Sequence, residues 1–227
     1  MRQCITIVVF LLSSSKAFGL GVPDLSHKEA MPGLKEVLIV SANKAVGQLA
    51  AQDGFFANSE VKIPLPNAFK KAEKGMRMLG MGKDTDALVL NINRAAEAAV
   101  PEAKVLLMNA VKQMRVDDAK AILTGKHDAA TQYFKRTTSA AMVEKLLPIV
   151  KKITENVKLA QQYNQLADMG SKFGIVKNEQ VSLEAYVTQK TLDGVYLMMA
   201  KEEAAIRQNP LGQASQMIKK VFGAIGK

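Results

Sequence analysis

Apolar residues recur at helical spacing along this chain, and proline and glycine repeatedly break the pattern. From Leu34 to Leu49 the apolar side chains return every three, four or seven residues, which is typical of one buried helix face. No segment of any length alternates apolar and polar residues as a half-buried strand does. The sequence therefore predicts an all-α fold. Because the breaks are frequent, we expect a single compact multi-helix domain of short helices with Pro/Gly-punctuated connectors, and no long coiled coil.

Capping residues and prolines indicate where the helices begin and end. Asp117 and Asp128 each precede a short apolar run, so we expect them to cap two short helices joined by the turn 124–127. Ser182 is expected to cap a later helix that ends at Asn209. Three other helices are expected over 34–53, 66–80 and 86–100, and Pro101 either kinks the third or opens a new helix. A long helix is expected to start at Thr138 or Ser139, to be interrupted at Pro148 and to run on to Gly170. A last amphipathic helix is expected to hold Met217, Ile218, Val221 and Phe222 on one side.

Residues 61–66 form the one stretch that cannot be helical, because Pro64 and Pro66 remove backbone donors and restrict the residues before them. We expect an extended connector that lays its apolar side chains on the core. No linker-like composition divides the chain. The expected organisation is a cleavable signal peptide over residues 1–19, a flexible N-terminal lead over 20–32, and a single helical domain over 33–227.

The N-terminus has the order of a secretory signal peptide. Arg2 precedes the apolar run 5–12, and Ala17-Phe18-Gly19 supplies the small-x-small pattern at which a signal peptidase cuts. The run is much shorter than the roughly 20 apolar residues of a membrane span. We therefore expect cleavage after Gly19, no transmembrane segment, and a periplasmic or secreted protein. The alternative is a buried N-terminal helix.

The chain is basic, with a formal net charge of +10. Loss of the signal would remove Arg2 and Lys16 and lower this charge by two, to +8. Such an excess favours an anionic partner, for which we consider anionic lipid, lipopolysaccharide or an envelope protein. The alternative is a soluble basic protein with charged helix faces. We expect no nucleic acid partner, because the basic residues are not interleaved with stacking aromatic residues.

Motifs for catalysis and cofactors are missing from the sequence, including HExxH, G-x-S-x-G and the kinase set. Residues 75–83 resemble a phosphate loop, but Asp84 stands where a hydroxyl should bind magnesium. Cys4 lies within the signal, which leaves His27 and His127 and rules out a four-ligand zinc site of cysteine and histidine. A carboxylate-rich site at His127 with Asp117, Asp118 and Asp128 is the alternative, but helix capping explains these aspartates. We expect no cofactor, no metal and no catalytic residue.

A polar centre is the best candidate for a site. On a helix over 86–100, Ala95, Ala96 and Ala99 share one face, which lets the two short helices after Asp117 and Asp128 pack closely. That packing would carry Arg94 and Glu97 towards Asp118 or Tyr133. The alternative is a solvated helix face with a surface ion pair. The candidate polar centre comprises Asn93, Arg94, Glu97, Asp118, Asp128 and Tyr133.

Methionines gather near the end of the second expected helix, at Met76, Met78 and Met81. Methionine suits adaptable apolar surfaces, and it also fills cores that are poor in aromatic residues. Only 5% of this chain is aromatic, so core filling is the preferred interpretation.

Five motifs in a fixed order resemble a known family. They are Ile63-Pro64-Leu65-Pro66, Asn93-Arg94-Ala95-Ala96-Glu97, Asp118-Ala119-Lys120-Ala121-Ile122-Leu123-Thr124-Gly125, Asp128-Ala129-Ala130-Thr131-Gln132-Tyr133-Phe134 and Leu192-Asp193-Gly194. Together they resemble the exported bacterial family catalogued as domain of unknown function 4197, over about Gly33 to Phe222. The resemblance implies a helical fold and export in bacteria, and it implies no activity.

These observations together favour a non-enzymatic binding or scaffolding protein at the bacterial cell envelope, with a basic surface for an anionic partner. The alternative is a carboxylate-dependent hydrolase that uses Glu97 with Asp118 or Asp128, since the separation of two carboxylates in space decides that chemistry.

Overall fold

The fold is all-α, as the sequence predicts. The computed structural model describes residues 27–78, 80–156, 163, 168 and 182–209, and these residues contain helices and no strand. The helices are α1 (His27–Ala50), the short 3-10 helix η1 (Asn67–Phe69), α2 (Lys70–Met78), α3 (Gly82–Ala99), α4 (Pro101–Gln113), α5 (Val116–Thr124), α6 (Ala129–Asn156) and α8 (Leu183–Gln208).

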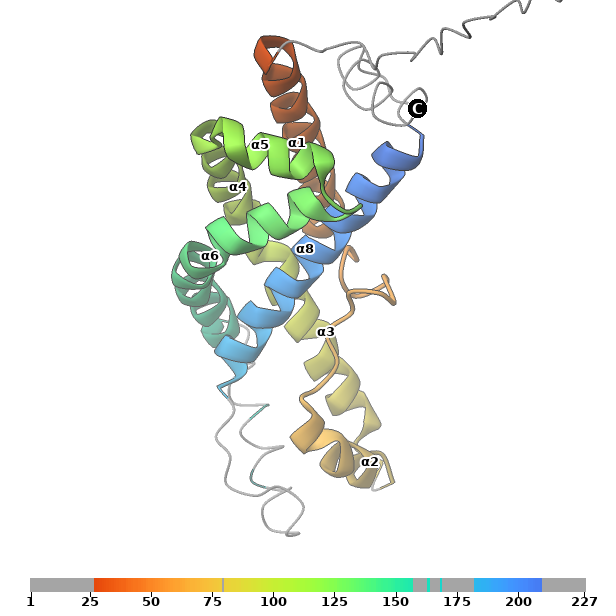
Figure 1. The fold of residues 1–227 in the computed structure, drawn as a ribbon. Coiled ribbons are helices and arrows are strands. Elements are labelled where there is room, and N and C mark those ends of the chain that lie inside the picture. Colours follow the sequence, from red (N-terminus) through yellow and green to blue (C-terminus); the bar gives the residue numbers. More distant parts are fainter. Residues whose placement is uncertain (1–26, 79, 157–162, 164–167, 169–181, 210–227) are drawn as a thin grey trace, which may run out of the picture.

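Three long helices, α1, α6 and α8, form the body of the molecule. The most extensive packing is between α6 and α8, while α1 packs across α4 and α8 (Figure 1). Phe55, Phe134, Leu107 and Leu146 are among the side chains buried at the centre. The helices α2 and α3 pack against each other, and α2 lies at the end of the molecule away from α5. The described helices therefore share one continuous core.

Two helices begin earlier in the chain than the sequence predicts. The first, α1, begins at His27, within the segment 20–32 that was expected to be a flexible lead. The helix α6 runs for 28 residues without a break at Thr138 or Ser139. The hydroxyls of these two residues donate to the carbonyls four positions earlier, at 2.7 and 2.6 Å, so they follow the helix and do not cap a new one. Pro148 is also accommodated inside α6, on its exposed side.

Several predicted boundaries are confirmed. Ser182 caps α8, since its Oγ accepts a hydrogen bond from Ala185 N at 3.2 Å, and the helix ends before Asn209. Pro101 opens α4 as its first residue. The predicted cap at Asp117 is wrong: α5 begins at Val116, after Arg115, so Asp117 lies inside the first turn. The signal peptide, the end of the helix predicted to reach Gly170, and the last amphipathic helix lie outside the described residues.

The chain leaves α1 through a tight turn that only glycine allows. Asp53 has φ 67°, in the left-handed region, and Gly54 follows it. A Cβ atom at Gly54 would lie 2.3 Å from the carbonyl oxygen of Gln48. Further turns follow up to Val61, and the connector then runs extended, with Ile63 and Leu65 each 1% exposed. The prediction that residues 61–66 lay apolar side chains on the core is confirmed.

Candidate functional site

Asn93 lies on α3, completely buried, and faces the 61–66 connector. Ile63 N donates to Asn93 Oδ1 at 2.8 Å, and Asn93 Nδ2 donates to Ile63 O at 2.9 Å. The same Nδ2 donates to Val89 O at 2.8 Å. A buried extended backbone needs partners for its polar groups. The side chain of Asn93 supplies both partners for Ile63, in place of a neighbouring strand.

Glu97 lies one turn further along α3 and is 5% exposed. Its Oε1 accepts hydrogen bonds from the backbone N–H groups of Phe55 and Phe56, at 3.0 and 3.1 Å. Its Oε2 accepts a hydrogen bond from Arg94 at 2.6 Å. Arg94 also donates to Asp53 Oδ1, at 2.7 Å. This cluster fixes the start of the connector, including the left-handed turn at Asp53.

The ring of Phe55, held in place by Glu97, packs against Gly194 of α8. A Cβ atom at Gly194 would lie 2.7 Å from Cε1 of Phe55. Glycine is therefore needed at this position for α8 to approach the connector, which gives the Leu192-Asp193-Gly194 motif a packing role.

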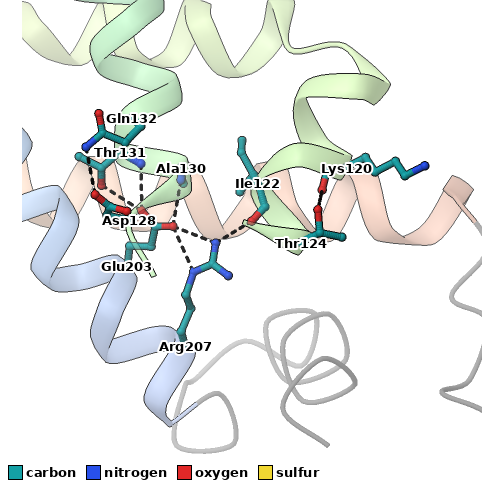
Figure 2. Close-up of polar contacts among 9 residues, drawn as sticks. All are labelled: Lys120, Ile122, Thr124, Asp128, Ala130, Thr131, Gln132, Glu203 and Arg207. Atoms are coloured by element: carbon teal, nitrogen blue, oxygen red, sulfur yellow. Dashed lines mark hydrogen bonds and ion pairs between the residues drawn. The ribbon is translucent and has the colours of Figure 1, made fainter. Parts of the chain in front are cut away.

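Glu203 on α8 is a second buried carboxylate, 5% exposed, which the sequence analysis missed. Its Oε1 accepts from Ala130 N at 2.9 Å, and its Oε2 accepts from Thr131 N at 2.9 Å and Thr131 Oγ1 at 3.0 Å. These N–H groups belong to the first turn of α6, where a helix offers no carbonyl partner. Figure 2 shows the carboxylate of Glu203 directed at the start of α6, with Arg207 beside it.

Arg207 extends this cluster to the end of α5. It donates to Glu203 Oε1 from Nε at 3.1 Å and from Nη2 at 2.9 Å, and Nη2 also donates to Ile122 O at 2.8 Å (Figure 2). Ile122 lies in the last turn of α5, where carbonyl groups lack helical partners. The last two turns of α8 thus supply hydrogen-bond partners to the end of α5 and to the start of α6, the two helix ends that flank the turn 125–128.

Asp128 stands just before α6, where the sequence analysis expected a capping carboxylate. Its Oδ2 accepts from Gln132 Nε2 at 3.0 Å, and this hydrogen bond is the main reason that the pKa of Asp128 is lowered. The first-turn N–H groups of Ala130 and Thr131 instead bind Glu203. The capping role expected of Asp128 is therefore carried by a residue of α8.

Asp118 and Tyr133 both line an open cleft of about 400 Å³ between α4, α5 and α6. The volume is within the range of small-molecule sites. Charged, amide and apolar side chains all contribute to its wall; the ones that matter for recognition are Leu106, Asn109, Gln113, Arg115, Asp118 and Arg136.

Two arginines flank the single carboxylate of this cleft. Asp118 Oδ1 lies 3.4 Å from Arg136 Nη2, and Asp118 Oδ2 accepts from the backbone N–H of Arg115 at 3.2 Å, with the Nε of that arginine 4.0 Å away. The side chains of Arg115 and Arg136 are 88% and 67% exposed. These three groups carry a net charge of +1, and most guanidinium donors face solvent.

Tyr133 forms the floor of the cleft. Its hydroxyl donates to Ala110 O at 2.9 Å, and the guanidinium of Arg136 lies 5.7 Å from its ring centre. Burial raises the pKa of Tyr133, so the phenol is neutral at physiological pH. It acts here as a fixed wall and a satisfied donor.

The six residues of the predicted polar centre thus have three sets of partners. Asn93, Arg94 and Glu97 bond to the connector between residues 53 and 63. Asp118 and Tyr133 line the cleft, and Asp128 bonds to Gln132. The expected bridge from Arg94 or Glu97 to Asp118 or Tyr133 is not formed. Arg94 bonds to Asp53, and Glu97 accepts hydrogen bonds from Phe55 and Phe56, because the backbone N–H groups at the start of the connector need acceptors.

Four residues of these clusters were not predicted from the sequence: Arg115, Arg136, Glu203 and Arg207. For Glu203 a signal existed, since it interrupts the apolar stripe of α8 that runs through Met199 and Ile206 at helical spacing. A charge in such a stripe needs a buried partner. Arg115 and Arg136 gave no such signal, because surface arginines are common on any helix.

In the described part of the chain, no three side chains of histidine, cysteine, aspartate or glutamate gather in a way that could hold a metal ion. None of the helices in those residues combines the length and the apolar character that a membrane crossing requires.

The described residues form an all-α, single-domain helical protein with an open polar pocket at α4, α5 and α6 and with buried carboxylate–arginine clusters at Glu97 and Glu203. The chain belongs to the family described as "Protein of unknown function (DUF4197)", whose sequence profile matches residues 24–223. The resemblance carried by the five motifs is thereby confirmed. Neither the curated proteins nor the solved structures include a match to this chain.

Proposed function

We propose that this protein is a non-enzymatic binding protein of the bacterial cell envelope, and that its α4–α5–α6 cleft takes a small anionic ligand. The observation that carries the proposal is the pair of exposed arginines, Arg115 and Arg136, at the rim around one carboxylate, Asp118. Planar guanidinium groups bind carboxylate and phosphate oxygens through paired hydrogen bonds. Asp118 orients Arg136 and leaves donors on both arginines for a ligand.

The rest of the cleft supports a ligand with polar and apolar parts. Asn109 and Gln113 lie four positions apart on α4, so their amides share one side of the cleft. Leu106 supplies an apolar contact on the same helix. A small organic anion fits this set of groups better than a bare inorganic ion.

The buried position of Glu97 supports binding over the hydrolase alternative. A general acid must exchange a proton with its substrate. Both oxygens of Glu97 are bonded within the protein, to Phe55 and Phe56 and to Arg94. Asp118 and Asp128 have partners of their own, Arg136 and Gln132.

Location at the envelope is supported by the signal-like order of residues 1–19. N-terminal sequencing of the protein from fractionated cells tests it. We expect a periplasmic or secreted chain that begins near residue 20, and an intact Met1 on cytoplasmic protein would contradict this part of the proposal.

The cleft is tested by NMR titration of the purified protein with citrate at constant ionic strength. We expect the Nε–Hε signals of Arg115 and Arg136 to shift, while that of Arg77, which pairs with Glu73 and Asp86 on the surface, shifts little. Arg136→Gln should weaken the binding about ten-fold or more, since a hydrogen bond to a charged group contributes about 1.5–3 kcal/mol. Equal shifts at all three arginines, or unchanged affinity in the variant, would reject the cleft as the site.

A further inference from the structure

The helix α2 carries a strongly one-sided charge pattern that the cleft does not use. Five exposed residues share one side of it, and we call them the α2 basic face: Lys70, Lys71, Lys74, Arg77 and Met78. At about 100° per residue they span an arc of about 120°. Met76, 7% exposed, lies on the opposite side, against the core. The α2 basic face is therefore turned away from the protein.

The lysines of this face have no acidic partner in the described part of the chain. Arg77 is neutralised, because its Nη2 lies 3.1 Å from Glu73 Oε1 and 2.6 Å from Asp86 Oδ1. For Lys70, Lys71 and Lys74, no carboxylate of the described residues lies within ion-pair distance. Three positive charges on two turns of helix repel one another unless an external anion screens them.

Met78, at the end of α2, is 82% exposed, the largest exposure among the described bulky apolar residues. A neighbouring lysine, Lys83, is exposed at the start of α3, across the turn from Met78. Figure 1 shows that α2 lies at one end of the molecule, where η1 and α3 are its main packing partners. The α2 basic face is therefore carried on a helix at one end of the described part of the molecule.

We propose that the α2 basic face docks the protein on an anionic phospholipid bilayer. Lysines without fixed partners act as mobile point charges, which suits a field of lipid phosphates better than one shaped protein pocket. An apolar side chain beside those lysines can enter the boundary between head groups and acyl chains. The partner is identified by charge complementarity with Lys70, Lys71 and Lys74 and by the exposed methyl end of Met78.

The test is co-sedimentation of the purified protein with phosphatidylglycerol vesicles, compared with phosphatidylcholine vesicles. The triple variant Lys70→Gln, Lys71→Gln, Lys74→Gln should bind phosphatidylglycerol about 100-fold more weakly, since each lysine near an anionic surface contributes about one kcal/mol. Met78→Ser should weaken binding about ten-fold through loss of the apolar contact. Wild-type binding should fall steeply with salt as the Debye length shrinks towards about 3 Å at 1 M.

A matched control removes the same charge from exposed positions of another helix, through Lys145→Gln, Lys151→Gln and Lys152→Gln on α6. This variant should bind almost as the wild type does. Equal losses in the two triple variants would show that only net charge matters and would overturn the proposal, as would equal binding to the two kinds of vesicle. Because these variants leave Arg115 and Arg136 unchanged, the result is independent of the cleft, and circular dichroism confirms that each variant folds.

Discussion

Glu97 and Glu203 are two buried carboxylates, one on α3 and one on α8, that each accept hydrogen bonds from backbone N–H groups that have no other partner. Each is 5% exposed, accepts hydrogen bonds from two successive backbone N–H groups, and pairs with an arginine of its own helix. They differ in the arginine: the side chain of Arg94 is 33% exposed, whereas that of Arg207 is 14% exposed. The comparison teaches that a buried carboxylate paired with an arginine can have the purely structural role of accepting hydrogen bonds from the backbone. We expect the burial of the arginine to set how much stability is lost when the carboxylate is removed.

The largest expected effect is at the deeper cluster. Glu203→Ala would remove the carboxylate that accepts two hydrogen bonds from Arg207, and it would strand three donors at the start of α6. We expect the free energy of unfolding to fall by about 3–5 kcal/mol, as for other broken buried ion pairs. Urea denaturation followed by circular dichroism measures this. The control is Glu60→Ala, which removes an ion pair to Lys201 whose two side chains are about half exposed, and it should cost under about 1 kcal/mol.

The shallower cluster should lose less. Glu97→Ala strands the N–H groups of Phe55 and Phe56, but Arg94 keeps Asp53 and its contact with water. We expect a loss of about 2–3 kcal/mol in the same urea experiment. If Glu97→Ala lowers the free energy of unfolding as much as Glu203→Ala does, the exposure of the arginine does not determine how much each cluster stabilises the protein.

Double-mutant cycles sharpen the comparison. The coupling between Arg207 and Glu203 should exceed that between Arg94 and Glu97, because the second pair is better screened by solvent. Each cycle needs the two single alanine variants and the double variant, measured by urea denaturation. Simple additivity at both pairs would show that neither arginine is energetically linked to its carboxylate.

The smallest effect is expected at Asp128, the residue that the sequence placed in the capping role. Asp128→Ala should change the free energy of unfolding by no more than about 0.5 kcal/mol, since its carboxylate is accessible to solvent and bonds to the surface residue Gln132. The pKa of Asp128 is lowered in the folded state, so its small contribution is present above the unfolded pKa and is lost as pH falls through the folded value. If Asp128→Ala lowered the free energy of unfolding nearly as much as Glu203→Ala, Asp128 would be the cap of α6 after all.

Local signals in the sequence were enough for much of the fold. Ser182 and Pro101 mark helix starts through interactions within a few residues, and Pro64 and Pro66 forbid helix by their own covalent structure. Local signals of this kind gave the wrong prediction where the side chain that bonds to the backbone lies far away in the sequence. Asp128 looks like a cap in its local context, but the acceptor that α6 uses is Glu203, more than 70 residues later.

The candidate site shows the same limit. Asn93, Arg94 and Glu97 were recognised as an unusual polar group, yet their partners are backbone atoms of the connector, which a list of side chains does not reveal. Asp118 and Tyr133 share a cleft only because α4, α5 and α6 converge. The arginines of that cleft became candidates only when their position beside Asp118 was known.

The junction of α8 with the turn 125–128 has a consequence for the order in which the molecule is made. Ribosomes produce a chain from its N-terminus, and the start of α6 and the end of α5 must wait for Glu203 and Arg207. Until those residues emerge, the corner between α5 and α6 has exposed backbone groups and no fixed angle. We therefore expect this corner of a nascent chain to take its final form only after the end of α8 has left the ribosome.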